Sequence, residues 1–462
     1  MKIGMTSQSK TALFEEKPVP EAVMKLAVPT MISSLVMVIY NLSDTYFVGM
    51  LNDPIQNAAV TLAAPMLLAF NAINNLFGVG SSSMMSRALG RKDYDTVYRS
   101  SAFGFYCSLF CGILFSVIYT VFNGSFLNLL GTSSATAAAT AGYLKWTVTF
   151  GAAPAILNVV MAYLVRSEGA TLHASIGTMS GCLLNILLDP VFILPWGLNM
   201  GAAGAGLATF LSNCAACIYF FVLLFVKRKN TFVCIRPSMF GFRKEIVTGV
   251  CGVGIPAAVQ NILNVTGMTI LNNFTSAYGS ETVAAMGIAQ KINMVPLYIA
   301  QGFSQGIMPL ISYNYASKNN KRMKHVTGFS MKASVSFMTV SLLIFHFGSG
   351  FLVSLFMKNE AIIVYGSRFL KGLSLALPFL SLDFLAVGVF TACGMGRKTL
   401  VFAILRKIVL EIPALFVLDK LFPLYGLAYA QFTAELILSA IGMITLVRLF
   451  KNLDRKSDNN SQ

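Results

Sequence analysis

Two acidic side chains stand in segments that are otherwise apolar. Asp44 lies in "YNLSDTYFVG" (40–49) and Asp189 lies in "NILLDPVFIL" (185–194). A charged side chain at the centre of a bilayer costs about 3 kcal/mol on insertion scales. If these segments cross a membrane, we therefore expect the two acids to have a function.

Each acid ends a stripe of polar residues at helical spacing. The first stripe occupies positions i, i+7, i+8 and i+11, and consists of Ser33, Tyr40, Asn41 and Asp44. The second occupies positions i, i+7 and i+11, and consists of Thr178, Asn185 and Asp189. Such spacing places each set on one face of a helix. Both helices enter from the same side, so the acids reach a similar depth.

Two further polar residues come from other segments, and one of them, Thr209, reaches a similar level. Thr209 lies about two turns into its segment from the opposite side, and Asn158 lies nearer the midplane. We therefore predict one ion site, made of Asp44, Asn158, Asn185, Asp189 and Thr209.

The predicted site suits either of two coupling ions, and we expect no other cofactor. Two carboxylates in a dry site repel one another, so one of them holds a proton readily. The same carboxylate, amide and hydroxyl oxygens would also bind Na⁺. The spacing leaves H⁺ and Na⁺ open. It also leaves open a purely structural role, in which each acid is bonded to neighbouring helices.

Composition identifies the bilayer as the surroundings of these segments. Of the 462 residues, 56% are hydrophobic and only 11% are charged, and the mean hydropathy is +0.70. Crossing a membrane takes about 20 apolar helical residues. We count twelve such spans, near 27–50, 58–86, 97–122, 143–165, 173–194, 203–226, 248–275, 282–312, 326–356, 369–393, 400–418 and 426–449. Because these runs are long and continuous, we predict an all-α bundle rather than a β-barrel.

The basic residues are distributed unevenly about these spans. With a cytoplasmic N-terminus, cytoplasmic segments carry 26 of the 34 Lys and Arg, and the outer loops carry five. This asymmetry follows the positive-inside rule. We therefore expect both termini in the cytoplasm, and we interpret the net charge of +16 as a topology signal rather than a nucleic-acid site.

The two halves of the chain match weakly but in order, at an offset near 226. When the halves are aligned, Pro29 matches Pro256, and "YLKW" (143–146) matches "FLKG" (369–372). Since each half holds an even number of spans, this predicts a parallel repeat of two six-helix lobes. We place the lobes at 1–226 and 246–462, joined by a cytoplasmic linker at 227–245.

The second lobe differs from the first in its polar residues, and its seventh span lacks an acid. Asp383 lies in "PFLSLDFLAVG" and could pair with Lys291 or Arg406, while the roles of Glu411 and Glu435 stay open. We predict a substrate cavity lined by Tyr40, Gln260, Asn264, Lys291, Gln305, Asp383 and Arg406.

Several motifs together resemble the multidrug and toxic compound extrusion (MATE) family, in its bacterial multidrug-export and DinF-like branches. They are "YNLSDTYFVGML", "GVGSSSMMSRALGRKDYDTVYR", "NILLDP" and "GFSQGIMPLISYNYASKNNKRMK". The resemblance implies an antiporter that exports small organic cations in exchange for H⁺ or Na⁺. We expect it in the bacterial inner membrane, as a monomer, although the sequence does not determine the oligomeric state. The resemblance places the family's ion site on the same five residues.

Other function classes have less support in the sequence. The resemblance leaves one alternative, a flippase for lipid-linked precursors, which the basic residues Lys291, Arg406 and Lys407 would suit. No group of nucleophile, base and orienting partner is evident, so we expect no enzyme activity. The natural substrate and the stoichiometry are left open.

Overall fold

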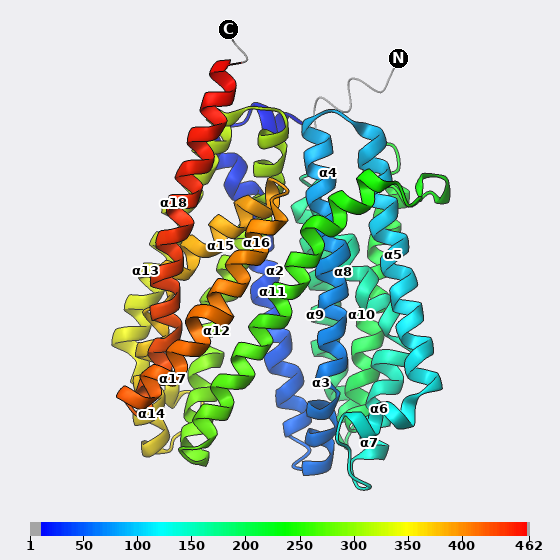
Figure 1. Cartoon of the computed structure of the whole chain (residues 1–462). Coiled ribbons are helices and arrows are strands. Elements are labelled where there is room, and N and C mark those ends of the chain that lie inside the picture. Colours follow the sequence, from blue (N-terminus) through cyan, green and yellow to red (C-terminus); the bar gives the residue numbers. More distant parts are fainter. Residues whose placement is uncertain (1–10, 460–462) are drawn as a thin grey trace. The chain divides into compact units, whose positions relative to one another are not determined.

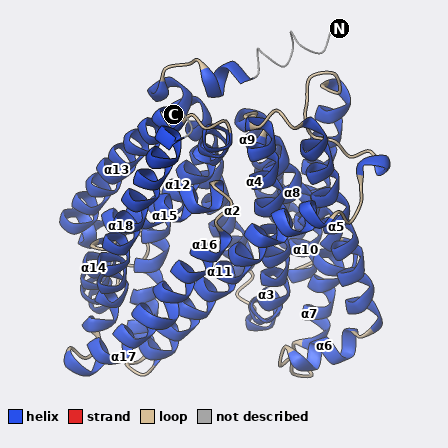
Figure 2. Ribbon diagram, turned by 45° about the horizontal axis from the view of Figure 1, so that its top comes forward, coloured by secondary structure: helices blue, strands red, loops and turns tan. Residues whose placement is uncertain are grey.

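The computed structural model describes residues 11–459, and within this range it consists of helices and loops without a strand (Figure 2). Helices suit a chain of this composition because hydrocarbon offers no partners for free backbone N–H and C=O groups. The chain divides into two compact units. The first contains Ile32–Ala258, and the second contains Ala12–Met31 and residues 259–459.

The first unit contains six spans, counting the second half of α2 (Figure 1). One continuous helical stretch is built of α3 (Pro54–Asn74), η1 (Asn75–Val79) and α4 (Gly80–Gly90). The remaining spans and the short α6 are α5 (Tyr94–Val121), α6 (Asn123–Leu129), α7 (Ala137–Leu144) with η2 (Lys145–Phe150) and α8 (Ala152–Ser167), α9 (Thr171–Ile193) and α10 (Ala202–Val226). The α7–η2 segment and α8 meet at a bend of 52°.

Small residues let the helices of the first unit approach closely. A Cβ atom at Gly112 of α5 would lie 2.8 Å from the Cα of Ala153 in α8. A Cβ atom at Gly181 of α9 would lie 3.1 Å from the backbone oxygen of Ser212 in α10. Such contacts are typical of helix packing in membranes, where small residues allow backbones to meet. They hold α5 against α8 and α9 against α10.

The predicted linker is an ordered strap on the first unit. The hydroxyl of Thr231 donates to both carboxylate oxygens of Glu168 at 3.0 Å, and the backbone N–H of Phe232 donates to the same carboxylate at 2.5 Å. Tyr106 donates its hydroxyl to the backbone oxygen of Ile235 at 2.7 Å. The 3₁₀ turn η3 (Pro237–Met239) follows.

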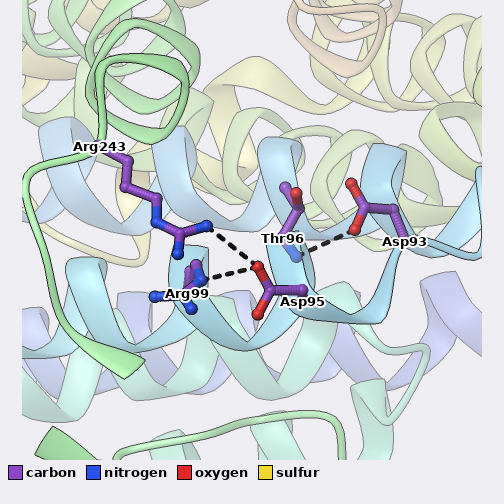
Figure 3. Close-up of polar contacts among 5 residues, drawn as sticks. All are labelled: Asp93, Asp95, Thr96, Arg99 and Arg243. Atoms are coloured by element: carbon purple, nitrogen blue, oxygen red, sulfur yellow. Dashed lines mark hydrogen bonds and ion pairs between the residues drawn. The ribbon is translucent and has the colours of Figure 1, made fainter. Parts of the chain in front are cut away.

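An ion cluster secures the end of the strap to the start of α5. Figure 3 shows Arg243 reaching Asp95, whose Oδ2 accepts from Arg243 at 3.3 Å and from Arg99 at 2.7 Å. Asp93 caps the helix by accepting from the backbone N–H of Thr96 at 3.2 Å. A side-chain oxygen in this position satisfies an amide that has no partner within the helix.

The second unit also contains six spans, counting the second half of α11. They include α12 (Ser280–Ala316), α13 (Asn320–Ser354), α14 (Glu360–Ser374) with α15 (Leu377–Ala392), α16 (Gly396–Ile404) with η4 (Leu405–Glu411) and α17 (Ile412–Leu421), and α18 (Ala430–Asn459), which is preceded by η5 (Tyr425–Tyr429). The α14 and α15 segments meet at a bend of 42°.

Two long helices belong partly to each unit. Within α2 (Val19–Gly49) the division falls after Met31, and within α11 (Lys244–Ser276) it falls after Ala258. Pro29 and Pro256 lie inside these helices, two residues before each division. The boundary between the units therefore lies inside two helices, α2 and α11. The sequence analysis placed the boundary at the linker 227–245.

Among the described residues, nine helices are long and apolar enough to cross a membrane, and counting each bent pair as one span gives eleven. A further continuous helical run extends from Gly396 to Leu421 and carries Arg406, Lys407 and Glu411. With these three charged side chains, this run is less apolar than the other eleven spans. Together they account for the twelve predicted spans.

The two described ends of the chain lie on the same side of the second unit. Arg322, in the first turn of α13, donates to the backbone oxygen of Phe14 at 2.6 Å. Asn320, two residues earlier, donates to the backbone oxygen of Leu453 near the end of α18 at 3.2 Å. An even number of spans requires this arrangement.

Candidate functional site

The structure brings the two first-lobe acids into one polar cluster. Asp189 on α9 is 0% exposed, and Asp44 on α2 is half-buried. Their charges interact directly. Each keeps one buried carboxylate oxygen, Oδ1, that accepts no hydrogen bond from the described residues. Because a buried acceptor without a partner is unfavourable, these two oxygens are the atoms most suited to binding a positive ion.

Asn185 links Asp189 to α10. With its amide nitrogen turned toward the carboxylate, Asn185 donates to Oδ2 of Asp189 at 2.9 Å. Its amide oxygen then accepts from the backbone N–H of Thr209 at 3.1 Å. Both amide atoms are satisfied in this orientation, so Asp189 is held from one side and its other oxygen stays available.

Two tyrosines border the same cluster. Tyr40, one turn before Asp44 on α2, makes a side-chain hydrogen bond with Thr209 and interacts electrostatically with both acids. Tyr143 on α7 is buried and also interacts electrostatically with Asp44, Tyr40 and Asp189. Four helices, α2, α7, α9 and α10, therefore contribute to one site.

Asn158 lies on α8 and is tied to α10. Its amide nitrogen donates to the side-chain oxygen of Asn213 at 2.9 Å. It also donates to the backbone oxygens of Pro154 and Ala155, at 2.9 and 3.1 Å. Since three acceptors surround the amide nitrogen, its orientation on the helix is settled. Contacts of its amide oxygen with the acids stay a prediction.

Local sequence explains how these side chains are positioned. Pro190 follows Asp189 directly and has no N–H to donate, which loosens the backbone hydrogen bonding of α9 at this point. Gly181 lets α10 approach α9 closely. The bend at Gly151 separates Tyr143 from Asn158 on the two parts of one span.

Two members of this neighbourhood were missed at the level of sequence. Asn213 lies four residues after Thr209, on the same face of α10, and that spacing could have identified it. Tyr143 carried no such signal, because an aromatic residue in an apolar run is usually a packing residue. Its place beside the acids is seen only in the structure.

The donor set fits the two ions that the sequence left open. Carboxylate, amide and hydroxyl oxygens are hard ligands that suit hard cations. Among the described residues no group of three or more His, Cys, Asp or Glu could hold a metal ion. Two carboxylates with one unsatisfied oxygen each are consistent with a singly charged ion, either Na⁺ or H⁺.

A second group of buried charges lies in the second unit. Asp383 on α15 is 0% exposed and forms an ion pair with Arg406 of η4, which is 4% exposed. Arg406 also lies 3.1 Å from a carboxylate oxygen of Glu435 on α18. Of the two partners considered for Asp383, the structure pairs it with Arg406, while Lys291 on α12 is exposed.

The adjacent residue of η4 forms a pair of its own. The ammonium of Lys407 donates to Glu411 at 2.7 Å, one helical turn further on. A Cβ atom at Gly267 of α11 would lie 3.2 Å from the Lys407 nitrogen, so this glycine makes room for the side chain. The carboxylates and bases of this group largely neutralise one another.

The other residues predicted to line a cavity are dispersed over two helices of the second unit. Gln260 and Asn264 lie half-buried on α11, four residues apart, and Gln305 lies half-buried on α12. Tyr40 belongs to the first unit and to the acid cluster. A common cavity for this set stays a prediction.

Comparison with known proteins supports the repeat and the fold. The MatE family model matches residues 29–191 and again 256–417, one match in each half. The chain is 33% identical over 438 residues to the multidrug export protein MepA of Staphylococcus aureus (strain MRSA252), covering 94% of this chain and 95% of that protein. It is also 33% identical over 439 residues to MepA of Staphylococcus saprophyticus, with the same coverage.

Solved structures agree. The fold matches that of an outward-facing multidrug resistance MATE family transporter with a TM-score of 0.90, over 96% of this chain and 98% of that one, at 23% sequence identity. The predicted class, an all-α membrane protein with twelve helices in two six-helix lobes, is thereby confirmed. With both halves matched by the same family model and nearly the whole length shared with its members, the chain belongs to the MATE family of membrane transporters.

Proposed function

We propose that this protein is a secondary active antiporter that exports small organic cations in exchange for H⁺ or Na⁺ by alternating access. The observation that carries the proposal is the pairing of Asp44 and Asp189, from separate helices, in one buried cluster of the first unit. We further propose a monomer in the cytoplasmic membrane with both termini in the cytoplasm. The MepA relatives are named multidrug export proteins, which supports the substrate class.

Ion binding at this pair would change the charge of the cluster. With both carboxylates ionised, repulsion in a poorly hydrated site is unfavourable. One bound Na⁺ or one proton relieves it, with the two free Oδ1 atoms as acceptors and Asn185 holding Asp189 in place. Because Asp44 lies on the helix that continues into the second unit, relief of repulsion can alter the path of α2.

The flippase alternative finds less support in the structure. A site for lipid phosphates requires basic side chains whose charge is available to the ligand. Arg406 and Lys407 are engaged with Asp383, Glu435 and Glu411. This leaves little positive charge in the buried part of the second unit to attract a phosphate.

Transport in liposomes tests the proposal. Purified protein would be reconstituted into vesicles loaded with a fluorescent organic cation, and Na⁺ and pH gradients would be imposed separately. We expect efflux driven by one gradient, and we expect Asp189→Asn to abolish it because the pair then lacks one charge. Equal efflux from wild type and Asp189→Asn would refute the assigned role.

Asp53→Asn is the matched control. Asp53 caps α3 by accepting from the backbone N–H of Ile55 at 2.8 Å, outside the acid cluster. Asparagine caps helices about as well as aspartate. The control therefore makes the same chemical change without touching the site, and it should transport as wild type does.

A further inference from the structure

The chain immediately before α2 is anchored to the second unit by an aromatic side chain. Phe14 is 2% exposed, and its ring stacks on that of Tyr313 of α12 with centroids 4.9 Å apart and an angle of 18°. Burying an aromatic ring contributes apolar area and directional packing together. Residues 12–17 therefore belong to the second unit and are anchored there through Phe14.

Arg322, in the first turn of α13, binds the carbonyl end of the helical turn formed by residues 11–15. Its Nε donates to the backbone oxygen of Phe14 at 2.6 Å, and its Nη2 donates to that of Lys17 at 2.5 Å. Carbonyls at the end of a helical turn have no partner within it, and a cation is favoured there. One guanidinium thus holds the Phe14 oxygen of this turn and the Lys17 oxygen just beyond it, and its Nη2 also lies 3.5 Å from the Leu13 oxygen.

Two consecutive residues of α12 complete the attachment. The hydroxyl of Tyr313 donates to the carboxylate of Glu15, and the amide of Asn314 donates to the backbone oxygen of Phe14 at 3.3 Å. Both α12 side chains are buried. The segment is therefore fastened by two helices of the second unit at once.

The first half of α2 is equally fixed. Ala22, Val23, Leu26 and Ala27 are all buried. At Gly306 of α12 a Cβ atom would lie 2.8 Å from the Cα of Ala27, so the two backbones touch. Beyond Met31 the same helix belongs to the first unit, where it carries Tyr40 and Asp44. One end of α2 is therefore clamped, and the other end carries an acid of the proposed ion site.

We propose that residues 11–17, clamped by Arg322, form a latch that fixes the start of α2 to α12 and α13. This inference rests on the proposed function. A change in α2 caused by an ion at Asp44 acts on the second unit only if the start of the helix stays fixed. Pro29 lies between the two, where its missing N–H removes one backbone hydrogen bond of α2. Arg322 is a positioning residue, since it acts through α2.

Hydrogen exchange and transport test the latch together. Arg322→Gln removes the charged clamp, and Phe14→Ala removes the stacked anchor by a different route. Lys321→Gln is the control, because Lys321 is exposed in the same turn of α13. Deuterium uptake of the peptide covering residues 11–18 would be followed by mass spectrometry in vesicles, alongside ion-driven dye efflux and dye-binding affinity.

We expect both variants to exchange faster than wild type in residues 11–18 and to lose most of their ion-driven efflux, because α2 would then no longer act on the second unit. Dye affinity should stay unchanged, which a general loss of structure would not allow. Unchanged exchange in both variants would show that no clamp exists. Faster exchange with wild-type efflux would show that the clamp does not serve coupling.

The result also separates the latch from the proposed function. If wild type itself shows no ion-driven efflux, the antiport proposal fails and the transmission role fails with it. If wild type transports but both variants do so equally well, only the latch is overturned. In either case the exchange data decide whether Arg322 and Phe14 hold the segment.

Discussion

At the scale of single residues, the acid pair depends on a neighbour that holds one of its carboxylates in place. Asn185 donates to Asp189 and accepts from the Thr209 backbone. Loss of such a supporting partner typically costs about 10- to 100-fold in ion affinity. We therefore expect Asn185→Ala to raise the half-saturating concentration of the coupling ion by about this factor, measured from efflux against ion concentration. Asn273→Ala, at an exposed position of α11, should leave it unchanged.

Arg406 permits a second prediction at this scale. Arg406→Met leaves Asp383 and Glu435 buried without their counter-charge, a change that costs about 3–5 kcal/mol when a buried pair is broken. We expect a clearly lower melting temperature in detergent. Adding Asp383→Asn should restore part of the loss, because it removes one uncompensated charge. Equal melting of Arg406→Met and wild type would mean that these pairs contribute nothing to stability.

At the residue level, helical spacing was the signal from which the site was predicted. Helical spacing joined Asn185 to Asp189 and Tyr40 to Asp44, and the structure finds these side chains in one cluster. For Asp383 the sequence left two partners open, Lys291 and Arg406. It does not show which face of a long apolar helix packs against which neighbouring helix. Tyr143 was missed because an aromatic residue in an apolar run is usually a packing residue.

At the scale of elements, close packing of α5 on α8 can be tested through Gly112. A Cβ atom there would lie 2.8 Å from the Ala153 Cα, so even alanine forces backbone to shift. Overpacking of this kind costs about 1–3 kcal/mol. We expect Gly112→Ala to lower the melting temperature. At Gly124 nothing lies within 4 Å of such a Cβ, so Gly124→Ala should be tolerated. A lower melting temperature for Gly124→Ala than for Gly112→Ala would contradict this packing.

The helices themselves were largely predictable, and their irregularities were not. Apolar length identified the spans, including 400–418 despite its charges. The sequence did not predict the π-helical turns η1, η2 and η4 or the 52° bend between η2 and α8. Packing against another helix accompanies the first of them: a Cβ atom at Gly78 in η1 would lie 2.5 Å from the ring of Tyr163 in α8. Such contacts are not local in sequence.

At the scale of the whole molecule, the repeat was visible as weak matches and is now seen in the family model, which fits each half once. The exchange of half-helices between units was not visible. Residues 12–31 precede every other span in the chain yet pack with the second unit. Chain order suggests that the units divide at a loop, but the packing of side chains places the division inside two helices. Phe14 and Leu26 are buried in the second unit. The hydrogen bond from Asn314 of α12 to the backbone oxygen of Phe14 joins residues 300 positions apart.

Topology supplies the last prediction. Because the basic residues gather on the side of the strap, we expect this side to face the cytoplasm. Ser238, in the strap, and Ser134, in the loop between α6 and α7, are both exposed. A membrane-impermeant thiol reagent should label Ser134→Cys but not Ser238→Cys in intact cells, and the pattern should reverse in inverted vesicles. The parent protein, with its eight cysteines, sets the background. Labelling of Ser238→Cys in intact cells would place the strap, and with it the start of α2, outside.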